Sequence, residues 1–289
     1  MPKNGQYFFS RWSKSPEPDI LIIIMDDRVN IILGGEGLVG VALRRRLSAL
    51  GERTVVHDIK SGFDLRSSVP PEYPGNAYYW FLAWDVGGAK YIMAEGTQAE
   101  ILRSNLRLCD MVFGWLHRRR ARYTFTSTQM VNYPNAYGIT KGVGEYWTRL
   151  AGRGLIARLW NVYDAEEPSV RSHVIPDLVQ QARGGEIRLQ TDGTERRQFL
   201  HAEDCAEGLI RQRESGQVLA DITTGSWVPI GDVAQVIGRL MKARVHPGPA
   251  PGYESLIEPT HPLPGWSPGI GLEAGLTRVI DAMTEKGWA

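Results

Sequence analysis

The chain has 289 residues, of which 43% are hydrophobic and 22% charged, with a formal net charge of +1. This length and composition allow one large α/β domain or two smaller ones with a proper core. The near-zero charge excludes a global electrostatic attraction to nucleic acid or to an anionic membrane. The two cysteines, Cys109 and Cys205, are far apart in predicted helices, which indicates small core residues in a cytoplasmic protein rather than a disulfide framework.

Residues 1–27 are predicted to be an extension of the first domain, partly disordered. The apolar run Ile20–Met25 is much too short to span a bilayer, and no small-residue cleavage site follows it. If the extension is ordered, Ile20–Ile24 adds an edge strand or packs on a neighbouring molecule. The histidines show no metal-type spacing with cysteines or carboxylates, so no metal site is expected.

A buried strand, Val29–Leu33, leads into a glycine-rich segment and then into an amphipathic helix, Leu38–Leu50, that Gly51 ends. Two glycine registers overlap here, and both describe a tight turn that lets a pyrophosphate approach the backbone at a helix N-terminus. The residues expected to bind a dinucleotide here are Gly34, Gly37, Leu38, Val39 and Gly40.

The second predicted strand, Thr54–Asp58, ends in a carboxylate 18 residues beyond Gly40. A carboxylate at this point accepts hydrogen bonds from the adenosine ribose and repels a 2′-phosphate, which favours NAD over NADP. The alternative is a turn residue at the strand end. Asp64 and Leu65 follow in a loop, where the acid either meets the adenine amino group or serves a turn.

A strongly apolar strand, Ala77–Ala83, precedes Trp84 and two glycines, Gly87 and Gly88, that would let backbone come close to a ligand. Thr97 and Glu100 form a predicted capping box for a long helix ending near His117. The basic run that begins at His117 suits the negative end of that helix better than it suits nucleic acid.

The next strand, Tyr123–Thr126, enters a cluster of three hydroxyl residues, and the helix Ala136–Leu150 follows. Tyr137 and Lys141 are four residues apart and therefore share one face of this helix. A lysine ammonium beside the phenol is expected to lower the pKa of Tyr137, so that it serves as an acid or base near neutral pH. The hydroxyl of Ser127 is expected to assist it.

Strands and helices alternate up to a further strand at Leu155–Leu159, which predicts a parallel sheet with helices on both faces. We expect a cofactor-binding domain over 28–163 and a smaller α/β part over 164–289, with the chain free to cross back between them. The elements expected in the second part are helices at 172–183, 202–213, 229–243 and 272–286 and extended segments at 187–190 and 218–222.

At this point the sequence resembles an extended short-chain dehydrogenase/reductase of the nucleotide-sugar epimerase/dehydratase family. The resemblance runs from Val29 to Ala282. The segments that carry it are Gly34-x-x-Gly37-x-x-Gly40, Phe81-Leu82-Ala83-Trp84, Ser104-Asn105, Tyr137-Gly138-Ile139-Thr140-Lys141, Ala157–Tyr163, Arg197–Asp204 and Gly265–Pro268. The resemblance implies a Rossmann fold, a doubly wound parallel sheet that binds NAD, with a smaller C-terminal part for a nucleotide-sugar substrate.

The resemblance also assigns residues. Leu82, Ala83 and Trp84 are expected beside the cofactor, where Trp84 replaces a residue that is small in the family. Asn105 is expected to be structural, and a homodimer is expected through the helices starting near Thr97 and Ala136. The residues expected to bind substrate are Gly87, Gly88, Asn161, His173, Val174 and Arg197.

The residues after Ser127 discriminate between reactions. Family dehydratases have Asp-Glu where this chain has Thr128-Gln129, so dehydration is disfavoured. Gln129 also stands where epimerase-reductases of the GDP-fucose-synthase type use a cysteine. The expected reaction is therefore epimerisation at one carbon, C4, through a transient keto-sugar, with Ser127, Tyr137, Lys141 and NAD.

Two alternatives stay open. One is a 4-keto reductase/3,5-epimerase in which His173 is an acid. The other is a catalytically silent NAD-binding homologue, because Ser127 and Tyr137 are only 10 residues apart and Trp84 is bulky. The stretch from Asp58 to Phe81 is also short for the family, so one strand and helix are expected to be reduced.

Overall fold

The computed structural model describes residues 28–253 and 257–289. The expected edge strand at Ile20–Ile24 lies outside these residues. Within them, six parallel strands form one sheet in the order β10-β5-β4-β3-β1-β2, as the alternating pattern predicted. The strands are β1 (Val29–Leu33), β2 (Arg53–His57), β3 (Tyr78–Phe81), β4 (Arg122–Thr128), β5 (Gly154–Leu159) and β10 (Leu219–Ile222).

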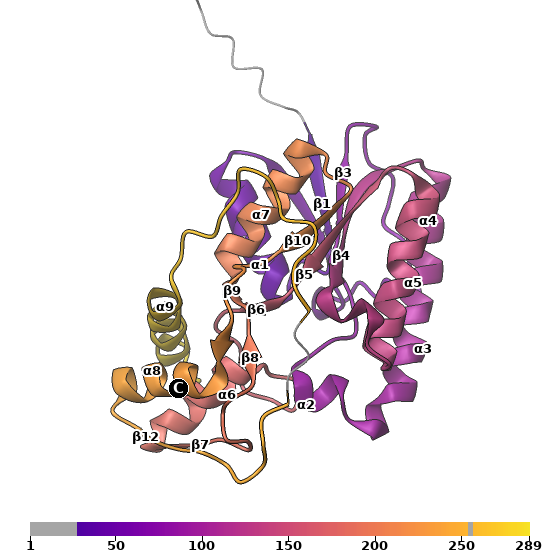
Figure 1. Cartoon of the computed structure of the whole chain (residues 1–289). Coiled ribbons are helices and arrows are strands. Elements are labelled where there is room, and N and C mark those ends of the chain that lie inside the picture. Colours follow the sequence, from indigo (N-terminus) through magenta and orange to yellow (C-terminus); the bar gives the residue numbers. More distant parts are fainter. Residues whose placement is uncertain (1–27, 254–256) are drawn as a thin grey trace, which may run out of the picture.

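Helices cover both faces of this sheet, because its inner strands are apolar on both sides (Figure 1). On one face lie α1 (Leu38–Ala49) and α7 (Ala202–Ser215), which pack on Ile32 and Trp80. On the other lie α3 (Gln98–Leu108), α4 (Gly114–Arg118) and α5 (Ala136–Ala151). Since α7 and β10 come from beyond residue 163, the chain crosses back from its second part to complete the sheet.

The connection between β2 and β3 contains only a 3₁₀ turn, Ile59–Ser61, and no strand among its described residues. The expected reduction of one strand and helix is therefore present. The second crossover helix continues from α3 into α4 through a π-helical turn, Cys109–Phe113. The predicted capping box is wrong: Thr97 already has helical backbone angles, and its hydroxyl donates to the carbonyls of Tyr91 and Ala94.

The second part packs three helices around its own core and lies at the carboxyl end of the sheet (Figure 1). The helices are α6 (Val174–Arg183), α8 (Ile230–Met241) and α9 (Leu272–Glu285). Three two-stranded pairs accompany them: β6 (Asn161–Tyr163) with β9 (Phe199–His201), β7 (Glu186–Arg188) with β12 (Arg244–His246), and β8 (Arg196–Arg197) with β11 (Val228–Pro229). A short helix, α2 (Ala89–Ile92), follows β3 in the first part of the chain. In the described part of the chain, no helix is long and apolar enough to cross a membrane.

Candidate active site

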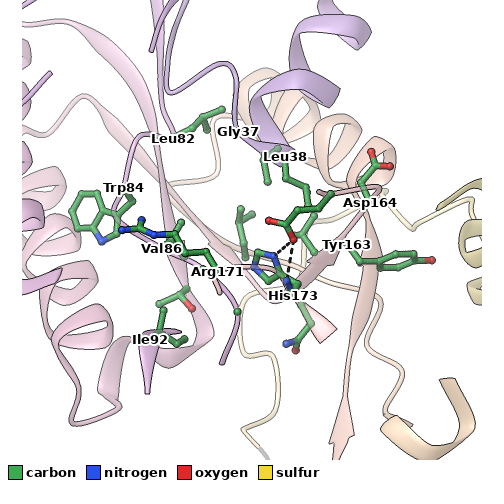
Figure 2. Close-up of a pocket in the computed structure, with 18 of the residues that line it drawn as sticks. Gly37, Leu38, Leu82, Trp84, Val86, Ile92, Tyr163, Asp164, Arg171 and His173 are labelled. Atoms are coloured by element: carbon green, nitrogen blue, oxygen red, sulfur yellow. Dashed lines mark hydrogen bonds and ion pairs between the residues drawn. The ribbon is translucent and has the colours of Figure 1, made fainter. Parts of the chain in front are cut away.

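A cavity of about 1760 Å³ lies between the carboxyl ends of the strands and the second part of the chain (Figure 2). Ligand pockets commonly measure ~300–1,000 Å³, so this cavity has room for two ligands. Every residue that the sequence singled out as catalytic, cofactor-binding or substrate-binding lines it. The tertiary structure therefore brings together side chains from positions 34 to 197.

The glycine loop between β1 and α1 forms one wall of the cavity. Gly34 has φ +91°, and a Cβ there would lie 2.5 Å from the backbone nitrogen of Ala83. A Cβ on Gly40 would lie 2.5 Å from the Gly34 carbonyl oxygen. A Cβ on Gly37, in contrast, would lie at an ordinary contact distance of 3.7 Å from the Gly34 carbonyl oxygen, and Gly37 is the N-cap of α1, where no side chain caps the helix. The first amides of α1 therefore face the cavity uncapped, which fits the phosphates of a dinucleotide.

Asp58 stands at the end of β2 with its buried carboxylate fixed by two backbone amides. It accepts the N–H of Glu36 and the N–H of Lys60, each at 2.9 Å. A carboxylate accepts more than two hydrogen bonds, so capacity is left for ribose hydroxyls. Asp64 stabilises a turn, since its carboxylate accepts the backbone N–H of Arg66 at 2.9 Å. The hydrogen bonds and charge of the Arg66 guanidinium hold the pKa of Asp64 below its usual value.

Tyr137 and Lys141 lie in the first turns of α5, which Asn135 caps by accepting the N–H of Gly138 at 2.8 Å. The Lys141 ammonium is 3% exposed and donates to the Thr126 carbonyl at 2.5 Å. The expected lowering of the tyrosine pKa is wrong for this structure. Burial raises the pKa of Tyr137 to about 12 and lowers the pKa of Lys141 to about 7, because desolvation disfavours both charged forms.

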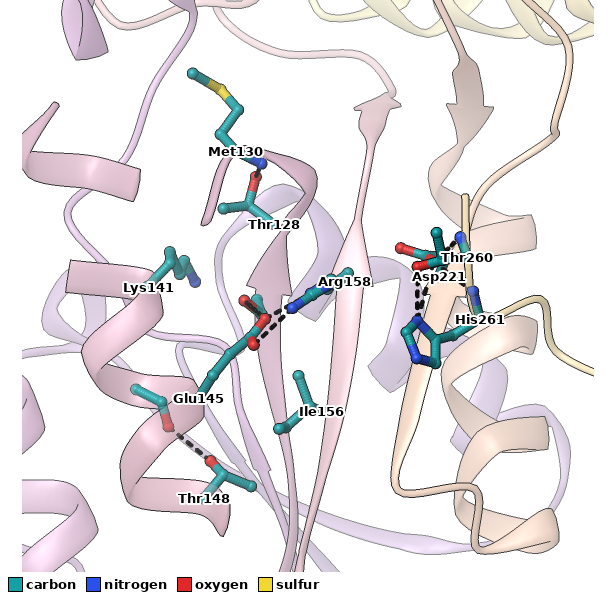
Figure 3. Close-up of polar contacts among 12 residues, drawn as sticks. Thr128, Met130, Lys141, Glu145, Thr148, Ile156, Arg158, Asp221, Thr260 and His261 are labelled. Atoms are coloured by element: carbon teal, nitrogen blue, oxygen red, sulfur yellow. Dashed lines mark hydrogen bonds and ion pairs between the residues drawn. The ribbon is translucent and has the colours of Figure 1, made fainter. Parts of the chain in front are cut away.

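The two hydroxyls at the end of β4 have different neighbours, and Figure 3 shows Thr128 beside Met130. Ser127 donates to the Glu145 carboxylate at 2.7 Å, away from Tyr137. The Thr128 hydroxyl acts on the Tyr137 phenol to lower its pKa, and it accepts the N–H of Met130 at 3.2 Å. Sequence reasoning missed Thr128, although alternation along the strand indicates that adjacent hydroxyls face different partners.

Glu145 lies one helical turn beyond Lys141 on α5, and its residue is 1% exposed. Its carboxylate accepts two hydrogen bonds from Arg158, at 2.7 and 2.9 Å (Figure 3), and one from Arg149 at 2.7 Å. Burial alone would raise its pKa, but the hydrogen bonds from Arg158 and Ser127 outweigh burial, and the pKa of Glu145 lies below its usual value. The network fixes α5 to β4 and β5.

At Gly87 and Gly88, neighbouring protein backbone rather than a ligand leaves no room for a side chain. The Gly88 N–H donates to the Arg171 carbonyl at 2.8 Å, and a Cβ on Gly88 would lie 2.2 Å from the Ser172 carbonyl oxygen. The Asp85 carboxylate also pairs with Arg171 at 2.8 Å. These contacts join the loop after β3 to the segment before α6 across the cavity.

His173 is the N-cap residue of α6, and Val174 is the first residue of that helix. Glu166, which the sequence did not single out, holds His173 twice: its carboxylate lies 2.9 Å from Nδ1 and accepts the backbone N–H at 3.0 Å (Figure 2). Burial would raise the pKa of Glu166, but the contacts with His173 outweigh it and the pKa is lowered. The cavity therefore contains a histidine with a fixed ring, and Figure 2 shows it apart from Trp84.

Asn161 and Arg197 complete the wall of the second part. The Asn161 side-chain oxygen is buried without a partner among the described residues. The Arg197 guanidinium donates to the Arg196 carbonyl at 2.7 Å and to the Tyr253 carbonyl at 3.5 Å, both neutral oxygens among the described residues. Both side chains retain capacity for a polar ligand.

An open parallel sheet with a glycine loop after its first strand and a Tyr-Lys pair on a helix facing the same cavity defines a Rossmann-fold, dinucleotide-dependent class of enzyme. Residues 93–220, from before α3 into β10, match the NAD dependent epimerase/dehydratase family. This segment of the chain is therefore similar to that family, and a solved epimerase shares the fold. The family depends on NAD, in agreement with the cofactor expected from Asp58.

Two curated relatives match the sequence. A putative GDP-L-fucose synthase 2 of Oryza sativa subsp. japonica is 26% identical over 89% of this chain and 81% of its own length. The dTDP-4-dehydro-6-deoxy-D-allose reductase of Streptomyces bikiniensis is 31% identical over 48% of this chain and 44% of its own.

Solved structures share the fold. The UDP-glucose 4-epimerase of Thermotoga maritima, solved with UDP-glucose, matches with a TM-score of 0.71 at 18% identity, over 89% of this chain and 99% of that one. The enzyme WbmF of Bordetella bronchiseptica, in complex with NAD+ and UDP, matches with a TM-score of 0.71 at 20% identity, over 90% and 93%. These likenesses confirm the predicted Rossmann fold.

Proposed function

We propose that this protein is an NAD-dependent epimerase that inverts one carbon of a nucleotide diphosphate sugar, C4, through a transient keto-sugar. The observation that carries the proposal is the grouping of Thr128, Tyr137 and Lys141 on one wall of a cavity whose adjoining wall is the glycine loop. A phenol with a hydroxyl and an ammonium beside it is suited to moving the proton of a sugar hydroxyl.

In this mechanism Tyr137 takes the proton of the sugar hydroxyl as the hydrogen on the same carbon leaves as hydride. Bound NAD supplies the hydride acceptor and donor and, when oxidised, a positive charge. Tyr137 must lose its own proton first, and its pKa of about 12 opposes this in the state described above. The Lys141 ammonium and the Thr128 hydroxyl favour the phenolate, and Thr128 takes the role that the sequence suggested for Ser127.

We propose that the second part holds the substrate. The planar guanidinium of Arg197 can donate two parallel hydrogen bonds and is suited to two oxygens of a diphosphate, and Asn161 supplies a neutral polar contact. Gly87, Gly88, His173 and Val174 line the same cavity as Tyr137, which supports a role for them in holding the sugar. The size of the cavity supports simultaneous binding of a dinucleotide and a nucleotide sugar.

A second candidate is a 4-keto reductase/3,5-epimerase, favoured by one observation, the His173–Glu166 pair. A carboxylate on Nδ1 fixes the ring and makes Nε2 a suitable acid or base for exchange at a carbon beside a ketone. The two curated relatives, a putative GDP-L-fucose synthase and a 4-dehydro-sugar reductase, support the same candidate.

The test is turnover of a panel of UDP-, GDP-, CDP- and dTDP-sugars in deuterated water, with NAD and separately with NADPH. C4 epimerisation converts one stereoisomer to another without net cofactor consumption and leaves no deuterium in the sugar. Deuterium at C3 or C5, or net oxidation of NADPH with a 4-keto sugar, identifies the second candidate. No turnover by the natural protein despite NAD binding refutes both and leaves the silent homologue; Tyr137→Phe is the matched inactive control.

We also propose that the protein forms a homodimer through α3 and α5. Their outer faces, uncovered in Figure 1, expose Leu102, Leu106, Ile139, Tyr146 and Leu150. Apolar side chains gathered on neighbouring helices support an interface between copies. Leu106→Glu should convert a dimer to a monomer in sedimentation analysis. The two buried free thiols, Cys109 and Cys205, support a cytoplasmic setting.

A further inference from the structure

The Lys141 ammonium lies inside a cage of three aromatic rings. Its Nζ is 4.4 Å from the ring centroid of Trp84, 4.9 Å from that of Phe125 and 5.8 Å from that of Tyr137. All three distances are within the ~6 Å over which a cation is attracted to an aromatic face. The rings come from the loop after β3, from β4 and from α5, so only the tertiary structure assembles the cage.

Little else in the described structure compensates the charge of Lys141. Its ammonium donates to the neutral Thr126 carbonyl, and no described carboxylate forms an ion pair with it. The titratable groups that face it are Cys109 in the π-helical turn, and Tyr137 and Glu145 on α5. The Glu145 carboxylate is already shared by two arginines and Ser127.

Trp84 presents the face of its ring to Lys141 without being held there by a hydrogen bond. Its Nε1 is buried and has no partner among the described residues, and the ring packs against Phe81 at 5.9 Å and Phe125 at 5.3 Å. Tryptophan gives the strongest cation–π attraction of the aromatic residues. Its position at 4.4 Å, the shortest of the three distances, makes it the main contributor to the cage.

We propose that Trp84 is a positioning residue that keeps Lys141 charged and beside Tyr137 by a cation–π contact. The bulky Trp84 ring lines the cavity, packs against Phe81 and Phe125, and has the Lys141 ammonium over its face. The catalytic consequence rests on the proposed function, whereas the contact itself does not. Since burial lowers the pKa of Lys141 to about 7, the contact would decide how much ammonium is present at neutral pH.

The test replaces Trp84 with mono-, di- and trifluorinated tryptophan, which keep the ring shape and burial but weaken the negative face of the ring. Lys141 is titrated in the NAD-free protein by NMR of ¹³C-labelled lysine, with its signal assigned by Lys141→Met. Its pKa should fall stepwise, by about 1 across the series, as expected for a cation–π contact of this kind. The same series at Trp115, a buried ring in the same core that faces Arg119, should leave Lys141 unchanged.

A Lys141 pKa that stays constant through the Trp84 series overturns the proposal. If the pKa falls and the protein epimerises a sugar, the alkaline limit of kcat should move down by the same amount. If the pKa falls but no nucleotide sugar turns over, the contact stands and the proposed function fails. Trp84→Phe, which retains a weaker aromatic face, should lie between the natural protein and the most fluorinated variant.

Discussion

The two hydroxyls that follow each other in β4 should have separable roles. Thr128→Val removes the hydroxyl beside Tyr137 and keeps the size of the side chain. Because this hydroxyl helps to lower the pKa of Tyr137, its loss raises that pKa and leaves less phenolate to take the substrate proton. We expect kcat to fall by ~10²-fold, the lower end for groups that assist proton transfer, which corresponds to about 2.7 kcal/mol. The free energy of unfolding should change by less than about 1 kcal/mol.

Ser127→Ala should have the opposite profile. It removes one of four hydrogen bonds to the buried Glu145 carboxylate, whose bonds to Arg158 and Arg149 remain. A hydrogen bond to a charged group contributes ~1.5–3 kcal/mol, so the free energy of unfolding should fall by about 2 kcal/mol. The value of kcat should change by less than about threefold, since the position of Tyr137 does not depend on Ser127.

The two measurements are single-turnover kinetics, on whichever sugar the substrate panel identifies, and urea unfolding of each variant. The double variant should show the sum of the two effects, because the hydroxyls belong to different networks. A Ser127→Ala protein with the kcat of Thr128→Val and an unchanged unfolding midpoint would refute this assignment. Thr128→Ser, which keeps the hydroxyl, is the control.

Three further predictions follow from buried contacts. Glu145→Gln leaves Arg158 without its charged partner and should cost about 3 kcal/mol in urea unfolding at pH 7. Because the folded-state pKa of Glu145 is lowered, that stability is present above its unfolded value of 4.5 and should be lost as the pH falls below it. The natural protein and Glu145→Gln should therefore converge in stability in acid. Gly88→Ala should cost about 2 kcal/mol and loosen substrate binding, because its Cβ would lie 2.2 Å from the Ser172 carbonyl oxygen; Gly75→Ala, in open space, is the control for unfolding. Asp58→Asn should weaken NAD about tenfold in fluorescence titrations and NADP much less, and equal losses for both would contradict the ribose role.

The sequence by itself determined the features that depend on neighbouring residues. The glycine turn into α1, the helix that carries Tyr137 and Lys141, and the alternation of strands and helices all follow from spacing within short segments. The parallel sheet follows from that alternation, because parallel strands need crossover helices. The family motifs then located the cavity, and all the predicted site residues line it.

Only the tertiary structure decided how these side chains meet. It placed Ser127 on Glu145 and Thr128 on Tyr137, because adjacent residues of a strand point in different directions and the sequence does not say which partner packs on each. It also reversed the expected pKa of Tyr137, since spacing gives the distance to Lys141 along a helix but not the burial of both groups. Trp84 is a bulky substitution in the sequence, and in the fold it is the ring against which the Lys141 ammonium lies, because packing with Phe81 and Phe125 sets its orientation.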